Sequence, residues 1–577
     1  MMIWIYMAMK KLLLLTLSII NVVSSTQPLV VINQYGYRPG DRKIAFLKEG
    51  RASTFEVIDL SSQRPALSGK IKSVGMTDPA TGDQLFTIDF SRLKVPGRYQ
   101  IWIPDLQVSS PEFAIAENAY WIVLHKTLQS FYYQRCGTEV ANGTVWSHPA
   151  CHLDDAAFFE KPTIKKDVTG GWHDAGDYGK FIATGALSAA FLLYAYELRP
   201  NNFADGQLMI PESANRVPDL LDEVRWELEW LLKMQREDGG VFHKTSTKKW
   251  TGEYLPHQDP DKRYIFPVSS TATAAFAAVT ALGARIMHEW DKALARRLLK
   301  ASIEAWGYLQ NHDGIIPAGG FKNPPGVQGG EYGDDRDTDE RLWAAVELYR
   351  LTKKPEYHTF FLSHYRSLGG FHHAISWQNV QNFAYTSYLK LPKGMQDQGA
   401  VAYLHATLIS FCDQLLKRTQ ENGYRSLLRG EEYYWGSNSV ALGYAFGFAL
   451  AHERTGRSPY AEAALDQLHY VLGRNTFGQT FVTGVGSNPP RRPYHQFSMM
   501  LGVGEPVPGL VVGGPNKNST LRGMIISPYP GKCYEDNPKN YFVNEVAINY
   551  TAPLTYVATY FTELSQSTIT RQATNRD

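Results

Sequence analysis

The pattern of hydrophobic and polar positions changes near residue 116. Before this point, short runs rich in β-branched and aromatic residues alternate with turn residues. Short strands at this spacing are typical of a small β-sandwich. The predicted strands are Leu29–Asn33, Lys43–Leu47, Thr54–Leu60, Gly69–Met76, Gln84–Phe90, Gly97–Ile103 and Pro111–Ala116. We therefore predict a β-sandwich domain over residues 26–116.

Beyond residue 116 the chain is rich in alanine, and its apolar residues recur with helical spacing. About twelve helices in hairpin pairs can close into a double ring, with about six inside and six outside. We predict a mainly helical domain over residues 117–570. The predicted helices span residues 117–135, 178–198, 218–236, 268–289, 290–310, 337–353, 356–367, 376–389, 398–418, 438–455, 458–473 and 541–564.

Two long connections rich in glycine and proline interrupt the helical pattern, over residues 314–333 and 474–540. Loops of this length inside a compact domain are usually functional or disordered. Because their composition is specific and not repetitive, we expect these two loops to form part of a site.

Composition narrows the class of protein. Apolar residues make up 44% of the 577 residues and charged residues 20%, so a large core can form and wholesale disorder is excluded. The net charge is only +2, which gives no electrostatic reason to expect a nucleic-acid partner. The 13 tryptophans and 33 tyrosines suit stacking on sugar rings, although ordinary core packing uses the same side chains.

The N-terminus has the features of an export signal. Lys10 and Lys11 supply positive charge before the apolar stretch Leu12–Val23, and Val23 and Ser25 are small residues before Thr26. We predict a signal peptide over residues 1–25 and a secreted or periplasmic protein; an uncleaved anchor is the alternative. No other run reaches the roughly 18 apolar residues of a membrane helix, so we expect no membrane span after cleavage.

The densest cluster of chemically useful residues lies between Gly170 and Phe181, which read Gly-Gly-Trp-His-Asp-Ala-Gly-Asp-Tyr-Gly-Lys-Phe. Asp174 and Asp177 are three residues apart with a glycine between them, so the backbone can turn both carboxylates toward one point. One carboxylate can then orient a water molecule while the other removes its proton. The alternative is that Asp177 caps a helix and Asp174 lies on the surface.

A second carboxylate of interest, Glu545, lies in Asn-Glu-Val-Ala-Ile-Asn-Tyr over residues 544–550. It follows a long loop and precedes an apolar stripe, so we expect it to open the last helix. Burial there raises the pKa of a carboxyl group, as a general acid requires. The alternative is a first-turn glutamate favoured by the helix dipole. Sequence spacing does not show that Glu545 and Asp177 meet.

Four segments, taken in order, resemble glycoside hydrolase family 9. They are Val31–Pro39, the Gly-Gly-Trp-His-Asp-Ala-Gly-Asp segment, Phe481–Pro490 and the Asn-Glu-Val-Ala segment. The resemblance covers about residues 28–565. It implies an (α/α)6 barrel preceded by an immunoglobulin-like β-sandwich, cleavage of β-1,4-glucans, and inversion at the anomeric carbon.

The resemblance also implies roles for individual residues. Asp177 corresponds to the general base, Asp174 to the partner that holds the water, and Glu545 to the general acid. Tyr550 matches a tyrosine near the reacting sugar, and His243 looks like a histidine that binds the sugar chain. Further candidates for stacking on sugar are Trp377 and Trp435.

One departure from the family pattern concerns substrate binding. The family usually carries Pro-His-x-Arg after the Asn-Pro-Pro loop, and here Tyr494 and Gln496 stand at the His and Arg positions. Glutamine donates two hydrogens and carries no charge, whereas arginine offers a charged planar fork. His495 and Arg492 are candidates to compensate; the alternative is that both pack in the loop. The departure leaves the identity of the sugar and endo or exo action open.

The cysteines give a candidate metal site. Cys136, Cys151, His152 and His173 form a set of two cysteines and two histidines, which suits tetrahedral zinc. The spacing is not that of a zinc finger, and a Cys136–Cys151 disulfide is the alternative in an exported protein. The resemblance favours a structural zinc that fastens the loop carrying the aspartates. The sequence leaves the state of Cys412 and Cys533 open.

An acidic loop over residues 331–340 is a candidate calcium site. Clustered carboxylates with a glycine are what calcium prefers, although the spacing of an EF-hand is absent. The resemblance to the family's calcium loop makes Asp335, Asp339 and Glu340 the candidate ligands; a solvated helix start is the alternative.

Three functions remain at this point: an endo-acting β-1,4-glucanase, an exo-acting hydrolase of gluco- or glucosamine-oligosaccharides on the same fold, and a non-catalytic carbohydrate-binding protein. The expected partner is a β-glucan polysaccharide or oligosaccharide. The three carboxylates Asp174, Asp177 and Glu545 argue against the non-catalytic function.

Overall fold

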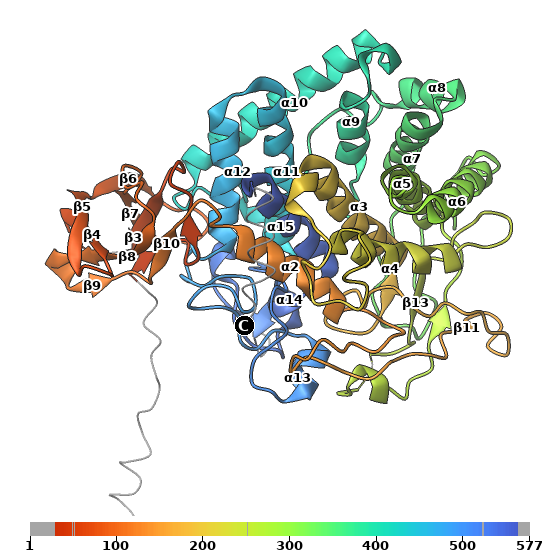
Figure 1. Ribbon diagram of the computed structural model, residues 1–577, viewed down its shortest axis with the longest axis horizontal. Coiled ribbons are helices and arrows are strands. Elements are labelled where there is room, and N and C mark those ends of the chain that lie inside the picture. Colours follow the sequence, from red (N-terminus) through yellow and green to blue (C-terminus); the bar gives the residue numbers. More distant parts are fainter. Residues whose placement is uncertain (1–28, 49, 51, 251, 522–523, 564–577) are drawn as a thin grey trace, which may run out of the picture.

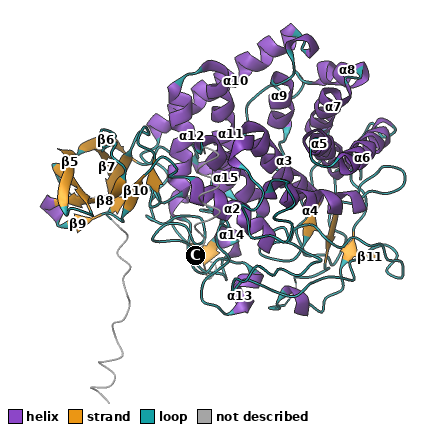
Figure 2. Cartoon of the chain, in the orientation of Figure 1, coloured by secondary structure: helices purple, strands orange, loops and turns teal. Residues whose placement is uncertain are grey.

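The computed structural model describes residues 29–48, 50, 52–250, 252–521 and 524–563. The predicted signal peptide lies outside the described residues. A β-sandwich at one end of the molecule packs against a much larger helical domain (Figure 1). Strands and helices are segregated between these two parts, apart from a short 3-10 helix, Pro104–Leu106, in the sandwich and short strands in the loops of the helical domain (Figure 2).

The β-sandwich has two sheets, with strand orders β1-β3-β7-β6 and β2-β10-β8-β4-β5, and β9 pairs with β8. Its core is formed by the inward side chains of both sheets, such as Ile88 and Ile101. The predicted strand Gly69–Met76 is in fact divided at Ile71 between β5 of one sheet and β6 of the other. The strands are β1 (Val30–Val31), β2 (Gly36–Tyr37), β3 (Ile44–Lys48), β4 (Thr54–Asp59), β5 (Arg64–Lys70), β6 (Lys72–Thr77), β7 (Gln84–Asp89), β8 (Gly97–Ile103), β9 (Val108–Ser109) and β10 (Phe113–Ile115).

The helical domain is the predicted double ring. The inner helices are α3 (Ile182–Leu198), α5 (Ser270–Met287), α7 (Thr338–Thr352), α9 (Gln381–Leu389), α11 (Ser437–Thr455) and α15 (Ile548–Phe561). Successive inner helices pack side by side, with α9 and α11 in contact through the rings of Phe383 and Phe446, and α15 returns to α3. The outer helices are α2 (Trp121–Tyr133), α4 (Asp219–Lys233), α6 (Lys292–Gln310), α8 (Pro355–His364), α10 (Gln398–Glu421) and α12 (Ser458–Val471).

The two rings differ in burial because they have different neighbours. Inner helices such as α3 and α5 are buried on nearly every face, and their small alanine and serine side chains let the helices approach closely. Outer helices such as α6 bury one apolar stripe of side chains against the inner ring and expose their polar face to solvent.

Helix α5 is long and apolar enough to cross a membrane by length and composition alone, and 94% of it is buried inside the molecule. The helix contains Ser270, three threonines and Arg285, so it is not the unbroken apolar run that the prediction concerned. The burial of α5 is that of a core helix, because its neighbours are the other helices of the ring.

The last predicted helix, 541–564, is in fact two helices, α14 (Tyr541–Asn544) and α15. Glu545 lies between them with φ −70° and ψ 139°, which is extended backbone. The break has a tertiary cause: the backbone of Glu545 pairs with Tyr494, and its carbonyl accepts a hydrogen bond from Gly513 N at 2.8 Å. Helical spacing alone could not reveal these long-range contacts.

The long connections and a small sheet cover one end of the ring. The sheet has the order β11-β14-β13-β12, from Ala157–Phe158, Tyr264–Ile265, Lys244–Ser246 and Lys180–Phe181. The loop over 474–540 contains α13 (Gln496–Leu501), β15 (Thr520–Leu521) and β16 (Met524–Ile525). These segments bring side chains from distant parts of the sequence to the end of the ring where α3 begins.

Candidate active site

Helix α4 holds the loop that carries Asp174 and Asp177 through hydrogen bonds to Trp172. Two buried glutamates of α4 hold Trp172: Glu227 accepts a hydrogen bond from its backbone N at 2.8 Å, and Glu223 accepts one from its indole N at 2.7 Å. Gly171 lies against the Trp230 ring at φ +73°, where a Cβ atom would come within 2.6 Å of the ring. A glycine is therefore required at this point.

Asp174 is buried and lies in the lining of the catalytic cavity. Its Oδ2 accepts a hydrogen bond from the Tyr332 hydroxyl at 2.7 Å, and its carbonyl accepts one from Ile548 N at 2.8 Å. Burial raises the pKa of Asp174 to about 7. The loop is thus joined directly to the first residue of α15.

Asp177 is half-buried, and its Oδ1 accepts a hydrogen bond from Gly179 N at 2.9 Å. Burial raises its pKa, while the Gly179 N–H and the charges of Arg263 and Lys244 oppose the rise. Burial lowers the pKa of Lys244 to about 7. Asp177 can therefore be ionised near neutral pH with a basicity above that of an exposed aspartate.

The side chain of Glu545 contacts the backbone of the same loop. Its Oε1 accepts a hydrogen bond from Gly176 N at 3.3 Å, and only 8% of the residue is exposed. Burial, followed by the charges of Asp177 and Asp174, raises the pKa of Glu545 well above its usual value. The structure thus brings together one carboxyl group suited to stay protonated and one suited to be ionised.

The three carboxyl groups line one cavity of about 340 Å³. Aromatic rings form much of its wall, including the predicted residues Trp377, Trp435 and Tyr550. Four further aromatic residues of the lining, Phe181, Trp250, Tyr332 and Tyr434, were not predicted from the sequence as site residues. The complete lining is Asp174, Ala175, Asp177, Phe181, Trp250, Gly330, Glu331, Tyr332, Trp377, Gln378, Tyr434, Trp435, Glu545 and Tyr550.

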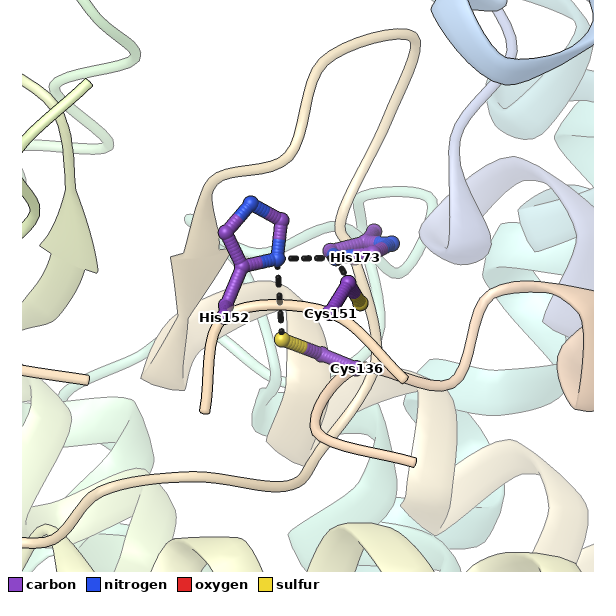
Figure 3. Close-up of side chains that lie close together, drawn as sticks. All are labelled: Cys136, Cys151, His152 and His173. Carbon is purple, nitrogen blue, oxygen red and sulfur yellow. Dashed lines mark hydrogen bonds between the residues drawn. The ribbon is translucent and has the colours of Figure 1, made fainter. Parts of the chain in front are cut away.

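The predicted zinc ligands lie together next to this loop (Figure 3). Cys136 Sγ is 3.5 Å from His152 Nδ1, Cys151 Sγ is 3.9 Å from His173 Nε2, and the two histidine nitrogens are 3.3 Å apart. All four donor atoms lie within 4.8 Å of one another. These separations fit the edges of a tetrahedron with ligands at about 2.3 Å for sulfur and 2.0 Å for nitrogen.

Two further features support a metal at this cluster. Cys136 and Cys151 are buried free thiols, so the alternative disulfide is absent from the described residues. His152 Nε2 lies 3.3 Å from Asp259 Oδ2, which is the outer carboxylate contact that metal-bound histidines usually make. The cluster is therefore able to bind a metal ion. Cys412 and Cys533 are also buried free thiols.

Known proteins identify the chain. The family model described as Glycosyl hydrolase family 9 matches residues 120–558, and the Cellulase N-terminal ig-like domain matches residues 25–108. Endoglucanase D of Acetivibrio thermocellus is 33% identical over 92% of this chain and 83% of its own length. A Cellodextrinase of Butyrivibrio fibrisolvens is 32% identical over 91% of this chain and 98% of its own length.

This chain belongs to glycosyl hydrolase family 9. A metagenome-derived family 9 endoglucanase superposes with a TM-score of 0.87 at 38% identity, covering 93% of this chain and 99% of that structure. A Zn-binding triple mutant of the family 9 endoglucanase J30 superposes with a TM-score of 0.84 at 35% identity, covering 91% and 99%. The mainly helical domain and the immunoglobulin-like β-sandwich before it are those of the family.

Two of the predicted sugar-binding residues of this family 9 chain lie away from the cavity surface. His243 is buried against Phe321, and its ring nitrogens contact Ser269 Oγ and Glu331 O, each at 2.8 Å. His495 is buried too, with its Nε2 2.9 Å from Gln134 Oε1 and its Nδ1 2.7 Å from Ser498 Oγ. Both ring nitrogens of each histidine already have a hydrogen-bond partner inside the protein, so neither position supports a direct sugar contact.

The two departures from the family 9 motif pack beside the catalytic loop. A Cβ atom on Gly176 would come within 2.4 Å of the Tyr494 ring, so this ring covers the glycine. Gln496 donates from its backbone N to Gly176 O at 2.8 Å and from its side-chain amide to Gly252 O. Gln496 therefore links the catalytic loop to the segment that follows Trp250. The side chain of Arg492 is exposed.

The acidic loop of this family 9 chain differs in part from the predicted calcium site. Asp339 and Glu340 are buried, and Asp339 Oδ1 and Glu340 Oε2 have no hydrogen-bond partner among the described residues. Asp335 is exposed, whereas the neighbouring Asp334 raises the pKa of Glu340 through its charge, after burial and Asp339. If the loop binds calcium, Asp334 is a better candidate ligand than Asp335.

Proposed function

We propose that this family 9 hydrolase is an endo-acting, inverting β-1,4-glucanase. The observation that carries the proposal is the convergence of Asp174, Asp177 and Glu545 on one aromatic cavity, with the Glu545 carboxyl group hydrogen-bonded to Gly176 of the aspartate loop. Inverting hydrolysis needs one carboxylate to activate water and one carboxylic acid to protonate the leaving oxygen. The aromatic walls provide flat apolar faces for sugar rings.

In this mechanism Asp177 removes a proton from water as the water attacks the anomeric carbon, and Glu545 donates its proton to the departing glycosidic oxygen. Asp174 accepts a hydrogen bond from the second O–H of the water, which is not transferred, and is itself oriented by Tyr332. Proton count balances, because the base gains one proton and the acid loses one. Tyr550 and the tryptophan faces hold the reacting sugar.

A second candidate is exo action on gluco- or glucosamine-oligosaccharides. The cavity lining within the described residues holds Asp174, Asp177, Glu331 and Glu545 but no lysine, arginine or histidine. Tyr494 and Gln496 replace the family's His and Arg, which removes cationic donors from this region. Carboxylates among aromatic faces suit a sugar that carries an ammonium group.

Product analysis separates the candidates. Endo action predicts a fast loss of viscosity of a soluble cellulose derivative, with little free sugar at first. Exo action predicts early release of short products with nearly constant viscosity, and faster turnover of glucosamine oligosaccharides would favour the second candidate. No turnover on any β-linked glucan or glucosamine oligosaccharide would overturn both and favour a binding protein.

We further propose that Cys136, Cys151, His152 and His173 hold a structural zinc. The two thiolates and two imidazoles fill a tetrahedron, so no position is left for substrate. The metal would fix the start of the catalytic loop through His173, which precedes Asp174. We also propose a secreted or periplasmic location, on the sequence pattern predicted as a signal peptide over residues 1–25. Calcium at the acidic loop remains a prediction.

A further inference from the structure

One aromatic residue of the catalytic cavity has a strained backbone. Tyr332 lines the cavity and lies in the left-handed region at φ +46°, which is an outlier for a bulky side chain. Such a conformation persists only where the surrounding contacts determine it, and it often occurs at functional sites. The hydroxyl of Tyr332 donates to Asp174 Oδ2 at 2.7 Å. The contacts that hold this backbone therefore also aim the hydroxyl.

Two buried side chains at the start of strand β13 hold the two carbonyls that precede Tyr332. His243 Nε2 lies 2.8 Å from Glu331 O, and since a carbonyl only accepts, this ring nitrogen is the donor. Lys244 Nζ donates to Gly330 O at 2.5 Å. Both side chains are buried, so water does not compete for either contact.

The two side chains are themselves fixed. His243 stacks on Phe321 with ring centres 3.8 Å apart, and its Nδ1 lies 2.8 Å from Ser269 Oγ. Burial lowers the pKa of His243 to about 3, so the ring stays neutral and keeps a single N–H. Lys244 Nζ also donates to Asn323 Oδ1 at 2.6 Å. His243 and Lys244 are therefore fixed points against which the cavity loop is held.

The Tyr332 ring is confined by its neighbours as well. The centre of the Phe181 ring lies 4.7 Å away and that of Trp377 5.2 Å away, and both rings meet Tyr332 edge to face. With its backbone held and its ring confined, Tyr332 keeps its hydroxyl at Asp174.

We propose that His243 and Lys244 are positioning residues that aim the hydroxyl of Tyr332 at Asp174, and that this contact sets how Asp174 holds the attacking water. The inference rests on the proposed function and deepens it. It gives a role to His243, whose ring the cavity does not use for sugar. The order of action is from β13 to the cavity loop, then to Asp174 and the water.

The surroundings of Asp174 give this contact a measurable signature. Burial raises the pKa of Asp174, the hydroxyls of Thr184 and Tyr332 oppose the rise, and the charge of Asp177 adds to it. The other ionisable groups that face Asp174 are Glu227 of α4, Glu545, and Tyr550 of α15. Removing the Tyr332 hydroxyl should therefore raise the pKa of Asp174 further, and a protonated Asp174 is a poorer acceptor for water.

The first measurement is kcat against pH for the full-length enzyme and Tyr332→Phe, on a β-1,4-gluco-oligosaccharide. We expect kcat to fall about tenfold with KM nearly unchanged. The acidic limb reports the ionisation of the two neighbouring aspartates, so it should move to higher pH. Tyr385→Phe is the matched control, because its buried hydroxyl donates to Tyr365 O at 2.9 Å among the core helices. This variant should leave kcat and the limb unchanged.

A double-mutant cycle tests the link from β13. His243→Phe keeps a flat ring but cannot donate to Glu331 O, and it should lower kcat about tenfold. Combined with Tyr332→Phe, it should cost no more than the larger single loss, because both act through one contact. His243 serves better than Lys244 here, since the charge of Lys244 also acts on Asp177.

Several results would overturn the inference. Tyr332→Phe with unchanged kcat, with a raised KM alone, or with a lower kcat but no shift of the acidic limb would each do so. A double variant that loses about a hundredfold, the product of the single losses, would separate His243 from Tyr332. If His243→Phe does not fold, Tyr332→Phe decides alone. If the unsubstituted enzyme cleaves no β-1,4-glucan, the proposed function fails instead, so the two failures are distinguishable.

Discussion

At the scale of single residues, the site depends on carboxyl groups with different surroundings. Burial raises the pKa values of Asp177 and Glu545, and the negative charges of Asp177 and Asp174 raise that of Glu545 further. A base needs to be ionised and an acid needs to be protonated at the same pH, so this order of pKa values suits the proposed roles.

Substituting either proposed group should separate activity from stability. Asp177→Asn and Glu545→Gln should each reduce turnover by about 10²–10⁴-fold. Both carboxyl groups have folded-state pKa values above their unfolded values, so their ionised forms destabilise the fold above the unfolded-state pKa. The variants should therefore melt about 1–3 °C higher at neutral pH, measured by calorimetry. A lower melting temperature together with lost turnover would indicate damage to the fold.

The pH profile tests the proton donor separately. Turnover of a glucan should fall at low pH as Asp177 becomes protonated, and at high pH as Glu545 loses its proton. Glu545→Gln should keep activity on an aryl glycoside whose leaving group needs no protonation, and its profile should lose the alkaline limb. An alkaline limb that persists in this variant would assign that limb to another group.

Residues that lie close together in the sequence were the most predictable part of the site. Asp174 and Asp177 lie in one dense motif, so their meeting could be predicted. The contacts of His495 could not, because the loop over 474–540 places it beside Gln134 rather than in the cavity. Tyr332 was missed as a partner of Asp174, since its segment was considered only for calcium.

At the scale of elements, two groups of contacts hold the catalytic loop in addition to the glutamates of α4. One is the Cys/His cluster, and the other is a chain of hydrogen bonds through α2 and α13. In the second, Val507 N donates to Ser498 Oγ at 3.0 Å, and His495 joins Ser498 to Gln134. Gln134 Nε2 then donates to His173 O at 3.2 Å and Ala175 O at 3.3 Å, on either side of Asp174.

Loss of zinc should loosen this loop. The purified protein should contain about one zinc per chain. Cys151→Ser should remove the metal and lower the melting temperature, because metal binding to a folded site is folding free energy. Metal analysis and calorimetry check both, with Cys412→Ser as the control that keeps its zinc. A Cys136–Cys151 disulfide found by mass spectrometry in native protein would contradict the site.

His495 should act as a positioning residue and not as a sugar ligand. Burial lowers its pKa to about 3, so it stays neutral where the enzyme works. His495→Ala should reduce kcat about tenfold with little change in KM, since a small displacement of catalytic groups is costly. His495→Gln, which can donate and accept, should restore part of kcat. A rise in KM with unchanged kcat would instead favour a direct sugar contact.

Most of the long helices were predictable from their periodicity, and so was their pairing into two rings. The break at Glu545 was not, because it is imposed by Tyr494 and Gly513 from a distant loop. The small sheet β11-β14-β13-β12 was also missed, since strands of two or three residues carry no periodic signal.

At the scale of the whole molecule, the β-sandwich is joined to the helical domain by a buried ion network. Asp466 of α12 accepts from Arg42 of the sandwich at 2.7 Å and from Arg425 and Arg474 at 2.8 Å. Although burial opposes them, the arginines hold the pKa of Asp466 below its usual range. Gln34 of the sandwich adds contacts by accepting from Asn488 N at 2.8 Å.

Asp466→Asn should destabilise both domains together. The fully buried Arg474 would lose its charge partner, and breaking such a pair costs about 3–5 kcal/mol. Calorimetry should show a large fall in melting temperature. Glu462→Gln is the control, because Glu462 pairs with Arg42 from a partly exposed position and should cost at most about 1 kcal/mol. Equal effects of the two substitutions would show that the buried network does not join the domains.

The central claim, inverting hydrolysis by Asp177 and Glu545, is tested most directly by proton NMR of the first product formed from a β-1,4-gluco-oligosaccharide. Spectra recorded before mutarotation should show the α-anomer at the new reducing end, because water attacks from the face opposite the leaving oxygen. Initial appearance of the β-anomer would show retention of configuration and would contradict the assignment of Asp177 as a base acting on water.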